Sequence, residues 1–181
     1  MIGRLRALGR IYQLVARAGW DEVSLDDLVT AELADYGIAR EGRVAIEGPP
    51  VRLRIKATVA IGMLLHDLAE NALRKGGLSV PQGRLQLTWS IEQPEKPDAR
   101  LVIHWRETDG PEHSSAIEAA LDGPTLSRRL KEEIEASAEI RFGDRGIEAD
   151  IAVSFASGSV VLLAASPEGR AGADHAPEDS S

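Results

Sequence analysis

The sequence predicts an α/β fold, a two-layer sandwich with a mixed, mainly antiparallel sheet that is preceded by helices. Three observations support this fold class. Segments with helical periodicity come first, hairpin-connected strand segments follow, and further helices are interspersed so that they can gather on one face of a sheet. Hydrophobic residues make up 43% of the 181 residues, which is enough for a single core, although aromatic residues contribute only 4%.

Two helices are expected to begin the chain. Apolar residues recur at three- and four-residue spacing over residues 5–18, and Gly19 ends this amphipathic helix. Ser24 has the properties of an N-cap for a second helix over residues 25–33. The acidic side chains in the first turn of that helix suit the positive end of its dipole.

A long helix is predicted over residues 55–75. Two short strands, 43–46 and 51–53, precede it around a Gly-Pro-Pro turn, and Gly76-Gly77 stops it. The predicted buried stripe consists of Ile61, Leu65, Leu68 and Ala72, with Leu64 at its margin.

The remaining elements form the predicted sheet and its cover. Residues 84–91 and 101–105 are expected to pair as a hairpin, because apolar side chains alternate along the first of them. The expected elements after this hairpin are short helix 114–121, charged helix 126–136, antiparallel strands 138–142, 148–155 and 160–165, and a disordered tail over 166–181.

Composition excludes several classes of function. The chain carries 21 Lys and Arg against 29 Asp and Glu, a net charge of −8, which argues against a nucleic-acid surface. It has no cysteine, so disulfides, thiolate metal sites and cysteine catalysis are excluded. No window reaches the roughly 20 apolar residues of a membrane span, and the N-terminus does not resemble a secretory signal. We therefore expect a cytoplasmic protein.

Polar side chains share one face of the long helix. Helical spacing places Asp67, Asn71 and Arg74 together, with Lys75 at the edge of the same face. A carboxylate, a carboxamide and a cation at this spacing suit a nucleotide phosphate with Mg²⁺, because Mg²⁺ uses only one or two protein oxygens beside phosphate and water. The spacing alone fits a solvated helix face of mixed charge at least as well.

A family resemblance favours the nucleotide reading. The segment LLHDLAENALRKGGLSVPQGRLQLTW resembles the N-box of HWE-type histidine kinases, with His66, Asp67 and Asn71 at its His, acidic and Asn positions. Trp105-Arg106-Glu107 resembles the Trp-x-Glu signature that follows in the family. The similarity is strong over residues 53–111 and weaker over the rest of the chain up to about residue 155.

The resemblance implies an ATPase domain of the histidine kinase, gyrase and heat-shock chaperone type. It assigns Asp67 a catalytic role in positioning water or metal, and it makes Asn71 the Mg²⁺ ligand. Glu107 would lie near the adenine pocket, although Trp105 fits the role of a core aromatic better. The cofactor-binding residues implied for Mg²⁺ and ATP are Asn71, Arg74, Lys75, Glu107, Gly110 and Gly123.

The same resemblance implies an organisation and partners. Residues 1–36 resemble the second dimerisation helix and its linker, residues 37–165 the ATPase domain, and residues 166–181 form a tail. The implied partners are a response regulator and a second copy of the chain. The exposed apolar stripe of the first helix also favours a homodimer.

Two departures from the family pattern leave alternatives open. The glycine-rich lid is represented by residues 122–127, DGPTLS, and its proline has no N–H to offer a triphosphate. The phospho-accepting His-Arg-x-x-Asn box is absent, and the four histidines, His66, His104, His113 and His175, lie in other contexts. One hypothesis is a kinase domain that is truncated or whose acceptor lies on another chain. The second is a degenerate, non-catalytic binding module, and the third is an unrelated α/β domain with a coincidental helix.

Overall fold

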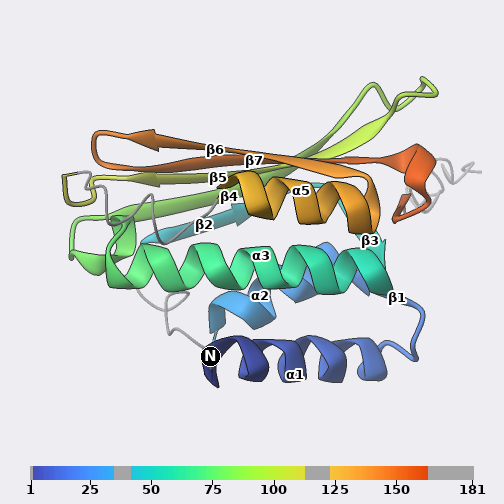
Figure 1. Cartoon of the computed structure of the whole chain (residues 1–181), viewed down its shortest axis with the longest axis horizontal. Helices are drawn as coiled ribbons and strands as arrows, with labels where there is room; N and C mark the ends of the chain where they lie inside the picture. Colours follow the sequence, from blue (N-terminus) through green and yellow to red (C-terminus); the bar gives the residue numbers. More distant parts are fainter. Residues whose placement is uncertain (1, 35–41, 113–122, 163–181) are drawn as a thin grey trace, which may run out of the picture.

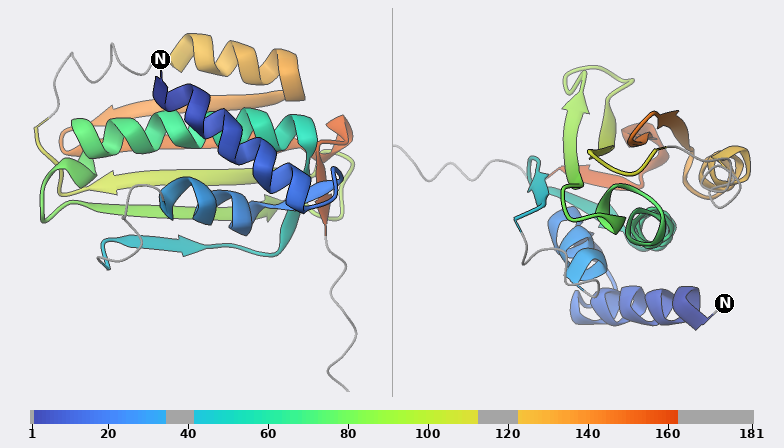
Figure 2. Two further views of the ribbon diagram at one scale, coloured as in Figure 1. Left: turned by 90° about the horizontal axis from the view of Figure 1, so that it is seen from below. Right: turned by 90° about the vertical axis from the view of Figure 1, so that its left-hand side faces the viewer.

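The computed structural model describes residues 2–34, 42–112 and 123–162 (Figure 1). A five-stranded sheet forms one layer, and helices α3 (Ile55–Arg74) and α5 (Gly123–Ile134) lie against one of its faces. Helix α1 (Ile2–Arg17) crosses α3 on the side away from the sheet (Figures 1 and 2). Helix α3 is therefore enclosed between the sheet and α1.

The large sheet has the mixed, mainly antiparallel character that the sequence predicts. In spatial order its strands are β2 (Val44–Glu47), β4 (Arg84–Glu92), β5 (Arg100–Thr108), β7 (Gly146–Ser154) and β6 (Ala136–Gly143). Strand β2 runs parallel to β4, and every other neighbouring pair is antiparallel. The fold class is thus confirmed.

A second, smaller sheet was not predicted. It consists of β1 (Glu22–Ser24), β3 (Val51–Arg54) and β8 (Val160–Leu162), in the order β1-β3-β8. The prediction that the last strand joins β6 and β7 is wrong, because β8 pairs with β3 instead. A short 3₁₀ helix, Phe155–Ser157, and a left-handed Gly158 (φ 68°) turn the chain out of the large sheet before β8 begins.

The link between β2 and β3 also changes sheets. A Cβ on Gly48 would come 2.3 Å from the ring of Trp89, so only glycine lets the chain pass over this indole. The Trp89 indole N–H donates to the carbonyl oxygen of Pro49 at 2.7 Å. These contacts direct β2 and β3, which are neighbours in the sequence, into different sheets.

The helices follow the predicted periodicity with shifted ends. Helix α2 (Leu25–Ala34) has the expected N-cap, since the Asp27 N–H lies 3.5 Å from the Ser24 hydroxyl oxygen. Leu64 of α3 is 2% exposed and belongs to the core rather than to its margin. The last predicted helix begins earlier, at Gly123, with Pro124 in its first turn, where the missing N–H costs nothing.

Helices α1 and α3 pack closely in one continuous core. Ala7, Ile11 and Val15 of α1 are buried. A Cβ on Gly62 of α3 would lie 2.7 Å from Ile11 Cδ1, so glycine allows the two helices to approach. The orientation of α1 on α3 is thus set by packing.

Some expectations concern other parts of the chain. The predicted helix 114–121 and tail 166–181 lie outside the described residues. Within the described ranges, no helix combines the length and the apolar run that a membrane crossing requires.

Candidate functional site

The polar face of α3 forms one wall of a pocket of about 340 Å³. Its lining residues are Arg4, Asp67, Glu70, Asn71, Arg74 and Lys75. The structure thus brings together four of the residues that the sequence singled out, in the arrangement that helical spacing predicts. It adds one residue from another helix, Arg4 of α1.

Asn71 is the most enclosed polar residue of this pocket. Its side chain is 7% exposed, and its amide nitrogen Nδ2 has no hydrogen-bond partner among the described residues. Its backbone carbonyl ends α3 by accepting from the N–H groups of Lys75 (2.9 Å) and Gly76 (3.0 Å). Because an unpaired buried amide costs free energy, this side chain fits a ligand that carries oxygen acceptors or a cation at Oδ1.

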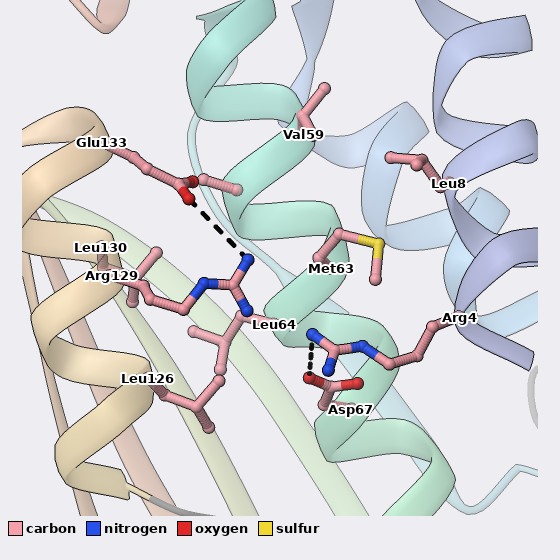
Figure 3. A pocket seen from close by; sticks show the side chains of 11 residues that line it. Arg4, Leu8, Val59, Met63, Leu64, Asp67, Leu126, Arg129, Leu130 and Glu133 are labelled. Carbon is pink, nitrogen blue, oxygen red and sulfur yellow. Dashed lines mark ion pairs between the residues drawn. The ribbon is translucent and has the colours of Figure 1, made fainter. Parts of the chain in front are cut away.

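Asp67 lies beside Asn71 and is paired with Arg4. The Arg4 guanidinium lies 3.3 Å from Asp67 Oδ2, and the Asp67 side chain is 17% exposed (Figure 3). Burial raises the pKa of the Asp67 carboxyl above its ordinary value, and Arg4 partly offsets that rise. Asp67 is therefore a carboxylate whose charge depends on a neighbouring cation.

The outer part of the pocket is more exposed. Arg74 pairs with Glu70 one turn earlier at 3.0 Å, and the Arg74 side chain is 73% exposed. No group of three or more His, Asp or Glu side chains among the described residues forms a metal site. Mg²⁺ held here would thus take one or two ligands from Asn71 and Asp67, and phosphate and water would supply the others.

Glu107 has a different environment from the one expected for an adenine acceptor. It is 4% exposed and accepts from the Gly77 N–H (2.6 Å) and from the Trp105 indole N–H (2.9 Å). Burial raises the pKa of Glu107, and these two hydrogen bonds lower it in part. Each carboxylate oxygen already has a donor and the side chain is enclosed, so an adenine amino group could reach Glu107 only if the packing around it opened.

Glycines pack closely against Gly77 and against the backbone of Glu107. A Cβ on Gly110 would lie 2.9 Å from Gly77 Cα, and one on Gly146 would lie 2.3 Å from the Glu107 carbonyl oxygen. The Gly110 N–H donates to the carbonyl oxygen of Arg145 at 2.9 Å. Gly110 is therefore a packing residue in this conformation, beside the end of α3.

The remaining predicted residue, Gly123, is the first residue of α5. It does not line the pocket that contains Asn71. Most of the sequence that corresponds to the family's lid is helical here, because residues 123–127 form the start of α5.

The two described histidines have structural partners. His66 is 3% exposed, and its ring nitrogens lie 3.9 Å from Glu32 of α2 and 3.9 Å from Glu70 of α3. Burial lowers the pKa of His66. His104 Nδ1 lies 2.7 Å from Asp150 Oδ1 on the neighbouring strand. His113 and His175 lie outside the described residues.

Comparisons with known proteins show similarity to histidine kinases. A family model described as HWE histidine kinase matches residues 1–50. A blue-light-activated histidine kinase of Brucella abortus is 26% identical over 148 residues, which are 82% of this chain and 30% of that protein. The Rhizobium johnstonii protein of the same name is 26% identical over 83% of this chain and 42% of its own length. The chain thus spans less than half the length of these curated relatives.

Solved structures share the fold. The histidine kinase domain of Erythrobacter litoralis EL346 blue-light-activated histidine kinase superposes with a TM-score of 0.62 and 20% identity, over 86% of this chain and 75% of that one. Histidine kinase ThkA, solved in complex with response regulator protein TrrA, gives 0.55 and 13% over 85% of this chain and 49% of that one. The chain is thus similar in sequence to HWE histidine kinases, and it has the fold of these histidine kinase domains.

Proposed function

We propose that this chain is the Mg·ATP-binding part of a histidine kinase. In this role it transfers the γ-phosphoryl group to a histidine, from which the group passes to a response regulator in a cytoplasmic two-component pathway. The observation that carries the proposal is the pocket on α3, where Asp67, Arg74 and Lys75 surround the buried and unpaired amide of Asn71. Catalysis at such a site consists mainly of positioning and charge neutralisation.

The acceptor histidine has to come from outside the described residues. His66 is 3% exposed, and His104 lines a different hollow, beside Asp150, rather than the pocket on α3. We infer that the acceptor belongs to a part of the protein outside the described residues or to another protein. We also propose a homodimer in which the outer face of α1 contributes to the contact, since Leu5 and Tyr12 of α1 are 72% and 42% exposed.

Isothermal titration calorimetry with Mg·ATP and with a nonhydrolysable analogue tests the proposal. We expect magnesium-dependent binding that Asn71→Ala abolishes, because this change removes the proposed metal ligand. Lys56→Ala serves as the matched control, since Lys56 is an exposed residue in the first turn of the same helix. Equal affinities of wild type and Asn71→Ala would contradict the assignment of the site.

A specific observation favours a second function, a non-catalytic kinase-like module that binds a protein partner such as a response regulator. Glu107 is 4% exposed and both of its oxygens accept hydrogen bonds within the protein, so the base-binding end of the site is closed in this conformation. Absence of binding at millimolar nucleotide by a protein with a native circular dichroism spectrum would select this alternative. Pull-down with a purified response regulator would then be the next measurement.

A further inference from the structure

Arg4 lies at the junction of two hollows on α3. One is the polar pocket that contains Asn71, and the other is a groove of about 210 Å³ between α1, α3 and α5, shown in Figure 3. Arg4 lines both, and its guanidinium points toward Asp67 (Figure 3). An arginine from α1 therefore forms part of the proposed phosphate site on α3.

The position of Arg4 follows from the packing of α1. Ala7, one turn further along α1, is fully buried, and Ile11 fills the space beside Gly62 of α3. Residues at positions i and i+3 lie on the same side of a helix, so the contact that buries Ala7 also directs Arg4 toward α3. Arg4 is thus held over the pocket for as long as α1 remains docked.

Arg4 also decides the sign of the charge in the pocket. The lining includes three cationic side chains, Arg4, Arg74 and Lys75, and two carboxylates, Asp67 and Glu70. The pocket is therefore net positive, whereas the whole chain carries −8. Without Arg4 the charges of the lining would balance, so the attraction for an anion depends on this one residue.

Arg4 can bind a second partner while it stays paired with Asp67. The Arg4 side chain is 47% exposed, and its guanidinium carries five N–H donors, more than the Asp67 carboxylate uses. Arginine forms bidentate hydrogen bonds with phosphate, and charge-assisted bonds of this kind are among the strong ones. Phosphate can consequently bind Arg4 while the Asp67 carboxylate remains its second partner.

We propose that Arg4 is a phosphate-binding residue of the α3 pocket, held in place by Asp67, and that α1 must stay docked for a polyphosphate anion to bind. The proposal rests on the nucleotide-binding function proposed above and adds a residue from α1 to it. Asp67 then acts as a positioning residue for Arg4. Displacement of α1 removes one of the three cations and so weakens binding.

The test is calorimetric titration of the purified chain with inorganic tripolyphosphate and, separately, with Mg·ATP. We expect Arg4→Ala to weaken tripolyphosphate binding about tenfold, the effect of losing one hydrogen bond to a charged group. Arg4→Lys should restore part of the affinity, since it keeps the charge without the planar fork. Arg6→Ala, an exposed arginine of the same helix, is the matched control and should change affinity less than about twofold.

Hydrogen exchange provides a readout that a merely structural role of Arg4 would not change. A ligand that binds only the docked state stabilises docking, so tripolyphosphate should slow amide exchange in α1 of the wild type and of Arg6→Ala. It should not do so in Arg4→Ala. Equal affinities for Arg4→Ala and Arg6→Ala would overturn the proposal, and so would tighter binding by Arg4→Ala, which would mean that the Arg4 side chain blocks the pocket.

The two ligands separate this proposal from the function it rests on. Binding of tripolyphosphate but not of Mg·ATP, with the expected loss in Arg4→Ala, would refute the nucleotide function and support the role of Arg4. Binding of Mg·ATP that depends on Asn71 and not on Arg4 would support the nucleotide function and refute the role of Arg4. Binding of neither ligand would refute both.

Discussion

Replacing Glu107 by glutamine changes a buried carboxylate that accepts two hydrogen bonds, from Gly77 at 2.6 Å and from Trp105 at 2.9 Å. A hydrogen bond to a charged group contributes about 1.5–3 kcal/mol. Glutamine has one acceptor oxygen, so its NH₂ group would face one of these two donors. Relief of the desolvation of the charge offsets part of the loss. We expect the free energy of unfolding to fall by about 1–2 kcal/mol.

A double-mutant cycle identifies the interaction behind this loss. Trp105→Phe keeps an aromatic ring but removes the indole N–H, so it leaves one Glu107 oxygen without that donor. Urea denaturation of wild type, both single variants and the double variant should give a coupling energy of about 1 kcal/mol between the two positions. If the two effects add within about 0.3 kcal/mol, the hydrogen bond does not stabilise the fold and our account of Glu107 is wrong.

The pH dependence of stability provides a second check on Glu107. Burial raises the pKa of this carboxyl in the folded state above its ordinary value of 4.5, so the folded protein holds the proton more tightly than the unfolded chain. The contribution of Glu107 to stability should therefore decrease as pH rises from about 4.5 through the raised pKa. Glu107→Gln should remove this slope. A slope that is the same in the variant would contradict the burial argument.

Two further predictions concern the packing of α3. Gly62→Ala should lower the free energy of unfolding by about 1 kcal/mol despite the higher helix propensity of alanine, because its Cβ would lie 2.7 Å from Ile11 Cδ1. Ile11→Val removes that atom. Its loss of unfolding free energy should therefore be smaller in the Gly62→Ala variant than in the wild type, and equal losses in urea denaturation would refute this. Burial lowers the pKa of His66 below 6.5, so wild-type stability should fall as pH falls from about 6.5 through the lowered pKa. His66→Gln should lack this loss, and an unchanged pH profile would count against a neutral buried ring.

Local geometry explains why part of the candidate site is predictable from the sequence. Asp67, Asn71 and Arg74 share a helix face whenever that segment is helical, and the apolar stripe of α3 predicts the helix by itself. Alternation along a strand likewise places Trp105 and Glu107 on one face of β5. The alternation therefore predicts that Trp105 and Glu107 lie close enough to form a hydrogen bond, whereas the family resemblance implies an adenine contact for Glu107.

Contacts between elements that are distant in the sequence were not predictable in this way. Arg4 reaches Asp67 only because α1 packs across α3, and the sole sequence signal was an arginine-rich first helix with a glycine opposite it at Gly62. The pairing of β8 with β3 depends on the turn at Gly158, and β1 is only three residues long. Propensity carries little information about such short strands, since tertiary pairing determines them.

The two ends of the candidate site differ physically, and this difference has a consequence for ligand choice. The end near Asn71 has an unpaired buried amide and a net positive lining, so it favours phosphate oxygens. Glu107, at the other end, is 4% exposed and has its hydrogen bonds formed within the protein, so a purine there must first open the packing around Gly77 and Trp105. Binding of the base therefore has to offset a rearrangement of Gly77 and Trp105 that binding of tripolyphosphate avoids. A chain that acts as an ATPase domain should accordingly show a change in Trp105 fluorescence with Mg·ATP and none with tripolyphosphate.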